Sequence, residues 1–144
     1  FCGKQTFISM VPNKAGVIRD CGDELMMFEM AVLCGEVMDF FTDIYYEIAR
    51  FICSYDVSLF FYTDNIAYNN GPFFKPEIFK KLYMPRLKKV LKPAFDKGLP
   101  IIFDSDGDIE WLIDDLINMG VDALHPIDPG GMDIYRIKEK NVLI

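Results

Sequence analysis

The side chains best suited to chemistry stand where short apolar runs of the sequence end. They are Asp64 and Asn65, the cluster Asp104, Ser105 and Asp106, and His125. Carboxylates and imidazoles can transfer protons when they are held beside a reacting group, so we predict catalytic roles for Asp64, Asp106 and His125. We predict that Asn65, Asp104 and Ser105 bind a small-molecule substrate through hydrogen bonds.

The acidic cluster also has the beginning of a calcium-binding loop. The run Asp104–Asp108 reads D-S-D-G-D, and an EF-hand loop starts in the same way. Such a loop needs glycine at its sixth position and glutamate at its twelfth, where this chain has Ile109 and Asp115. An apolar strand also precedes the run, where an EF-hand has a helix. The spacing therefore argues against a calcium loop.

Two other interpretations of the cluster stay open. A Mg²⁺ ion shared by Asp64, Asp104 and Asp106 would suit the preference of hard cations for oxygen ligands. The alternative is a plain turn between a strand and a helix, with Asp108 as the N-cap of the helix. The chain has one histidine, and its four cysteines lack CxxC spacing, so no zinc tetrad can be assembled from the sequence.

The elements that must position these residues alternate between strands and helices. We predict strands at Val57–Thr63, Leu99–Phe103 and Ala123–Pro126, and helices at Pro76–Lys97, Ile109–Met119 and Met132–Lys140. Such alternation favours a parallel sheet, whose strands carry their sites at the carboxyl ends. Carboxylates follow all three strands closely, at Asp64, Asp104 and Asp128, and would meet at one mouth of a barrel.

Smaller signals predict where the helices begin, bend and end. Pro76 suits a first helical turn, whereas Pro85 and Pro93 predict kinks or a break within the long helical segment. Gly98 and Gly120 are predicted to end the helices that precede them.

The amino-terminal third reads as one strand and two helices. Gln5–Val11 predicts the strand, and a largely apolar helix starts near Asp23 and is interrupted at Gly35. A second helix is predicted from Val37 to Cys53. Its apolar stripe, which we expect to face the core, consists of Phe40, Phe41, Ile44, Ile48, Phe51 and Ile52. Its charged side chains, expected to face away, are Asp39, Asp43, Glu47 and Arg50.

Composition narrows the class of protein and of partner. Acidic residues outnumber basic ones by 22 to 15, and the net charge of −7 argues against a nucleic-acid partner. No stretch approaches the ~18–20 consecutive apolar residues of a membrane span. The cysteine spacing is typical of reduced thiols, which favours a cytoplasmic protein. The apolar content of 51% and the first residue, Phe1, favour a fragment with surface made for missing neighbours.

The passage from Asp64 to Lys138 resembles the uroporphyrinogen decarboxylase-like superfamily, which includes cobalamin-dependent methyltransferases. The likeness is carried by the strand that ends in Asp64, by Gly71 and by KPEIFKKLYMPRLKKVL. It continues through GLPIIFDSDGDIEWLIDDLINMGVDALHPIDP and GMDIYRIKEK, over about half of the chain.

This resemblance implies an α/β fold, namely part of a TIM (β/α)8 barrel, with residues 1–144 as a single partial barrel domain. It implies one of two activities, decarboxylation of a tetrapyrrole or corrinoid-linked methyl transfer. It also implies a divalent metal ion as cofactor or a corrinoid as partner. Zinc-dependent relatives carry a His-x-Cys pair where this chain has Asp104-Ser105-Asp106.

A partial barrel cannot close by itself, so the fragment interpretation also predicts either a homodimer or sheet edges adapted to solvent. The rival hypothesis is a catalytically inert half-barrel that serves as an interaction or assembly module. An unrelated α/β fold is a further alternative.

Overall fold

The computed structural model describes the backbone of residues 24–140 and the side chains of residues 34–140. The helices are α1 (Glu24–Cys53), α2 (Pro76–Leu82), α3 (Met84–Lys97), α4 (Ile113–Met119) and α5 (Ile134–Lys140), with a short 3-10 helix η2 (Glu110–Leu112). The strands are β1 (Phe60–Thr63), β2 (Ala67–Tyr68), β3 (Gly71–Pro72), β4 (Ile101–Asp104) and β5 (Ala123–His125). The strand predicted at Gln5–Val11 lies outside the described residues.

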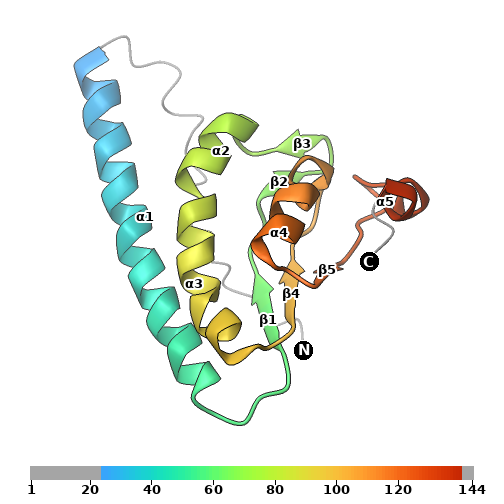
Figure 1. Ribbon diagram of the computed structural model, residues 1–144. Helices are drawn as coiled ribbons and strands as arrows, with labels where there is room; N and C mark the ends of the chain where they lie inside the picture. The colour runs from blue at the N-terminus through green and yellow to red at the C-terminus, as the bar shows by residue number, and fades with distance from the viewer. Residues whose placement is uncertain (1–23, 141–144) are drawn as a thin grey trace, which may run out of the picture.

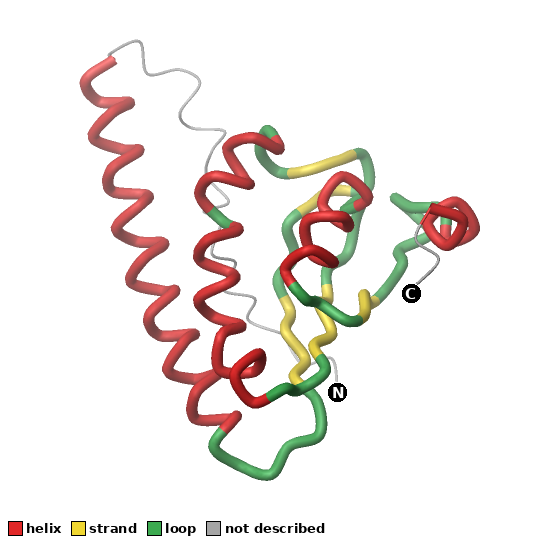
Figure 2. The backbone as a smooth tube through the Cα atoms, in the orientation of Figure 1, coloured by secondary structure: helices red, strands yellow, loops and turns green. Residues whose placement is uncertain are grey.

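The described strands confirm an α/β fold with a parallel sheet. β1 pairs with β4, and β4 pairs with β5, both in parallel, so the strands follow one another across the sheet in chain order (Figure 1). β2 and β3 form a small separate antiparallel hairpin between β1 and α2. Figure 2 shows helices alternating with the strands along the chain. Within the described residues, no helix has the length and apolar content needed to cross a membrane.

The sheet is packed more closely on one face than on the other. Phe60 and Tyr62 of β1 and Ile101 and Phe103 of β4 are buried together with apolar residues of α3 and α4. The residues between them point the other way, because successive side chains of a strand alternate between faces. Phe61, on that second face, is 48% exposed. The helices thus cover the first face, and the second face holds the more exposed side chains.

The long amino-terminal helix differs from the prediction in two ways. α1 is continuous through Gly35, so the predicted interruption is wrong. The predicted apolar stripe is not the buried face either: Met38, Thr42 and Ala49 are buried, whereas Phe40 is 63% exposed.

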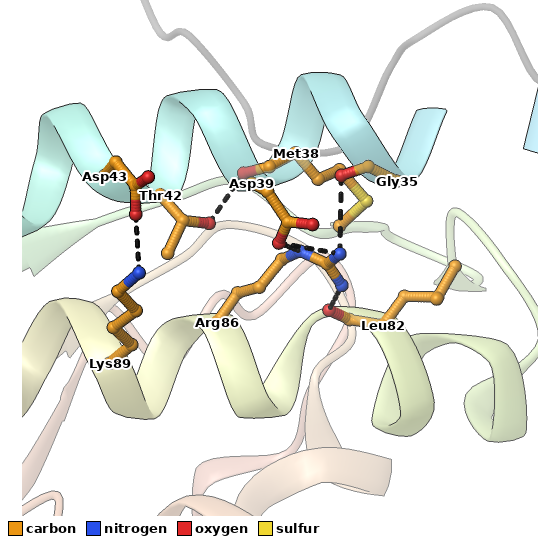
Figure 3. Close-up of polar contacts among 8 residues, drawn as sticks. All are labelled: Gly35, Met38, Asp39, Thr42, Asp43, Leu82, Arg86 and Lys89. Carbon is orange, nitrogen blue, oxygen red and sulfur yellow. Dashed lines mark hydrogen bonds and ion pairs between the residues drawn. The ribbon is translucent and has the colours of Figure 1, made fainter. Parts of the chain in front are cut away.

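The physical reason for this rotation of α1 lies in its contact with α3. Figure 3 shows Arg86 of α3 bound to Asp39, at 2.9 Å from Nε to Oδ1, and Lys89 bound to Asp43 at 2.5 Å. The Arg86 guanidinium also donates to the carbonyl oxygens of Leu82 and Gly35. These contacts connect the acidic side of α1 to α3, and the apolar stripe lies outside.

Proline and glycine fix the limits of the other helices, with one exception. Pro76 begins α2 as predicted, and the predicted break falls at Tyr83, so that Pro85 lies in the first turn of α3. Pro93, in contrast, lies inside α3 without ending it. Gly98 and Gly120 end α3 and α4 in left-handed conformations, with φ of 66° and 103°.

Candidate active site at the carboxyl ends of β4 and β5

An aspartate and the single histidine of the chain form a close pair at the carboxyl edge of the sheet. Asp104 and His125 are register partners on neighbouring strands, so their side chains leave the same face of the sheet. His125 Nδ1 lies 2.6 Å from Asp104 Oδ1, and the histidine side chain is 63% exposed. The Phe61 ring meets the imidazole edge-on, with 5.6 Å between the ring centroids. Two residues predicted from sequence are therefore brought into direct contact.

This geometry defines what the pair can do. A carboxylate only accepts hydrogen bonds, so a neutral imidazole beside Asp104 carries its proton on Nδ1 and leaves Nε2 as an acceptor. The carboxylate also holds the ring in one orientation, with most of the ring open to solvent. Nε2 of His125 can therefore take a proton from a bound molecule and return it.

Asp64 lies on the other side of the sheet from this pair. Thr63, not Asp64, is the register partner of Asp104, and a shift of one residue reverses the face to which a side chain points. Asp64 is 3% exposed and accepts a hydrogen bond from the Tyr83 hydroxyl at 2.9 Å. The Tyr62 hydroxyl lies 3.5 Å from the same carboxylate oxygen. The expected gathering of carboxylates at one mouth thus does not include the Asp64 side chain.

The tyrosines around Asp64 are strongly perturbed. Burial is the main cause that raises the pKa of Tyr62 and of Tyr83 well above the ordinary value, and the nearby Asp64 carboxylate raises both further. The pKa of Tyr45 on α1 is raised by the same two causes. Asp64 is consequently part of a buried polar cluster that joins α1, β1 and the α2–α3 junction.

The remaining predicted site residues shape the turn after β4. Ser105 is fully buried, and its Oγ accepts a hydrogen bond from the Ile66 amide at 3.3 Å and donates to the Asp106 carbonyl at 3.1 Å. Asn65 Oδ1 accepts from the Asp106 amide at 3.0 Å. Asp106 itself is exposed. These contacts bind the loop after β1 to the loop after β4.

The loop after β5 is joined to the same turn. Asp128 accepts hydrogen bonds from the Gly107 amide at 3.1 Å and from the Gly130 amide at 2.8 Å. Asp108 accepts a hydrogen bond from the Glu110 amide at 3.0 Å, but the predicted N-cap at Asp108 is wrong. The N-cap residue of η2 is Ile109 and that of α4 is Leu112, because the chain enters the helix through the 3-10 turn η2. Asp128 was expected among the carboxylates at the carboxyl ends of the strands. Its side chain connects the loop after β5 to the turn after β4.

A metal site would need a third ligand beside the pair. In the part of the chain that the structure describes, no three side chains of histidine, cysteine, aspartate or glutamate are grouped to hold a metal ion. Of the three carboxylates considered for a Mg²⁺ ion, Asp64 lies on the helical side of the sheet, away from Asp104.

One residue of the site was missed by the sequence reasoning. Phe61 packs beside His125. Thr63 is the register partner of Asp104, and side chains two residues apart on a strand point to the same face, so the alternation of β1 could have placed Phe61 on the face of the pair.

Comparisons with protein-family models, with curated proteins and with solved structures gave no match for this chain.

Proposed function

We propose that this chain is a uroporphyrinogen decarboxylase-like partial barrel in which the pair of His125 and Asp104 transfers protons to and from a small-molecule substrate. The observation that carries the proposal is the 2.6 Å contact between Nδ1 and Oδ1, with the histidine ring exposed at the carboxyl edge of parallel strands. Sites of parallel barrels lie at this edge. The strand order, which follows the chain, and the unequal covering of the two sheet faces are also features of a barrel wall.

Each residue then has a defined role. Asp104 orients the imidazole and, in the neutral ring, selects the tautomer with its proton on Nδ1. His125 Nε2 receives or delivers the proton. Decarboxylation of a tetrapyrrole side chain must end with protonation of carbon, and methyl transfer to a thiol must begin with loss of the thiol proton. A proton-transferring group of this kind would serve either of the two reactions that the family resemblance implies.

The activity test uses the purified chain with two reactions, decarboxylation of uroporphyrinogen and methyl transfer from methylcobalamin to a thiol. We expect turnover in one of them, and a loss of about 10²-fold or more in kcat for His125→Gln, which is the usual share of general acid–base catalysis. Asp114→Asn is the control, because that carboxylate is exposed on α4 away from the pair. Absence of both activities, or full activity of His125→Gln, would contradict the proposal.

A second measurement examines the pair without any substrate. Because His125 is the only histidine, its ring nitrogens give a single set of 15N resonances. We expect the tautomer with the proton on Nδ1 in the unaltered chain and a loss of that preference in Asp104→Leu. Equal tautomer populations in the two proteins would show that Asp104 does not orient the ring.

The second candidate function is an interaction module without catalysis. It is favoured by the exposed apolar stripe of α1, where Phe40 and Phe51 are 63% and 64% exposed. Absence of both activities, together with self-association of the chain, would support this candidate over the first.

A further inference from the structure

The outer face of α1 is an apolar surface without a neighbouring element among the described residues. α1 packs against α3, and Met38 and Ala49 are among its buried residues; Figure 1 shows α1 at the margin of the molecule with α3 on one side. We call the outward set the α1 seam: Val37, Phe40, Phe41, Ile44, Ile48, Phe51 and Ile52 of the helix, together with Tyr55, two residues after its end. A shallow, open depression on it is lined by Phe40, Asp43, Ile44, Glu47, Ile48 and Phe51.

The apolar positions of the α1 seam are arranged symmetrically in the sequence about Tyr46. Each seam position before Tyr46 has an apolar counterpart at the same distance after Tyr46. These pairs are Ile44 with Ile48, Phe41 with Phe51, Phe40 with Ile52, and Val37 with Tyr55. A two-fold axis through an antiparallel helix pair brings such positions level with one another, so the seam is complementary to a second copy of itself.

The charges beside the seam also fit a second copy. Asp39, Asp43 and Glu47 are each in an ion pair within the chain, with Arg86, Lys89 and Arg50 respectively. Three of the acidic groups beside the seam are thus neutralised within the chain, which lowers the repulsion between two copies of a chain with net charge −7. Glu36 and Asp56, at the two ends of the seam, are in no ion pair among the described residues. In the antiparallel arrangement, Arg50 of one copy is level with the segment of Thr42 and Asp43 in the other.

The area of the seam is enough for a dimer. A covered aromatic side chain buries about 150–250 Å², and most members of the seam are between 38% and 64% exposed. Covering the eight side chains would bury on the order of 500 Å² per copy, or roughly 1,000 Å² in total, which is near the lower limit for a specific interface.

We infer that the α1 seam is a homodimer interface in which α1 of one copy packs antiparallel against α1 of a second copy, with Ile44 of each facing Ile48 of the other. The inference rests on α1 alone and does not depend on the proposed function.

The first experiment measures the mass of the full chain in solution by sedimentation equilibrium over a range of concentrations. We expect a monomer–dimer equilibrium, weakened at least tenfold by Ile48→Glu, because each copy then places a carboxylate in the seam. Ile78→Glu is the matched control, since Ile78 on α2 is as exposed as Ile48, at 47%, but lies outside the seam. Circular dichroism of all variants checks that the helices are retained.

The second experiment tests the antiparallel register. Ile44→Lys alone should weaken the dimer as Ile48→Glu does, whereas the double variant Ile44→Lys/Ile48→Glu should restore it, because each lysine then faces a glutamate of the other copy. A parallel pair would place like charges together and give no rescue. A monomeric unaltered chain, including one that instead binds lipid vesicles, would overturn the inference. So would a dimer that Ile48→Glu leaves intact or that the double variant does not restore.

Discussion

Replacing Tyr83 with phenylalanine removes one oxygen atom from the buried cluster around Asp64. The Tyr83 hydroxyl donates to Asp64 Oδ2 at 2.9 Å, and both side chains are almost completely buried. Phenylalanine keeps the ring and its packing against Phe79, whose ring centroid lies 4.4 Å away. The variant therefore tests the hydrogen bond with little change in packing.

The expected cost follows from the burial of the carboxylate. A hydrogen bond to a charged group contributes about 1.5–3 kcal/mol, and a buried carboxylate that loses a donor cannot turn to bulk water instead. We expect Tyr83→Phe to lower the free energy of unfolding by about 1.5–3 kcal/mol, or roughly 4–9 °C in Tm for a chain of this length.

Urea unfolding followed by circular dichroism measures this change, with an unaltered m-value as the check that the unfolded state is the same. Tyr62→Phe is the comparison variant, because its hydroxyl lies 3.5 Å from the same oxygen, at the limit of a hydrogen bond, and its other partner is the neutral Tyr83 hydroxyl. We expect Tyr62→Phe to cost less than about 1 kcal/mol on that ground. Equal costs for the two variants, or a cost below about 0.5 kcal/mol for Tyr83→Phe, would refute this reasoning.

Two further predictions concern alkaline pH and the turn after β4. The pKa values of Tyr62 and Tyr83 are raised in the folded chain by burial and by Asp64. Unfolded tyrosines ionise near their ordinary pKa of about 10. Above that pH the folded state holds more protons than the unfolded state, so the free energy of unfolding must fall as the pH rises. Urea midpoints measured from pH 9 to 11 should show this fall, and the fall should be less steep in Tyr83→Phe; parallel curves for the two proteins would contradict the prediction. Gly107→Ala should be much more costly than Gly98→Ala, although both glycines have positive φ, because a Cβ at Gly107 would lie 2.6 Å from the Ala67 carbonyl oxygen and one at Gly98 meets nothing within 4 Å. We expect about 1–2 kcal/mol for Gly98→Ala and about 3 kcal/mol or more for Gly107→Ala in thermal unfolding, and equal losses would show that the loop contact does not matter.

Local sequence signals predicted the elements from Val57 onward well, because their causes are local. Pro76 begins a helix, and Gly98 and Gly120 end helices in conformations that suit a residue without Cβ. The apolar runs became parallel strands, and polar residues follow each of them. The exceptions were Pro93, which the packed helix α3 accommodates, and the small hairpin of β2 and β3.

The sequence alone established a parallel α/β arrangement with Asp104, Asp64 and His125 near strand ends, and it could not establish which side chains meet. That depends on register, since Asp104 aligns with Thr63 and with His125, and Asp64 is thereby turned to the helical face. The outward stripe of α1 was likewise decided by tertiary structure, because Arg86 and Lys89 lie 47 and 46 residues away along the chain from the aspartates that they bind. A periodic pattern defines the faces of an element, but only its neighbours in space decide which face is buried.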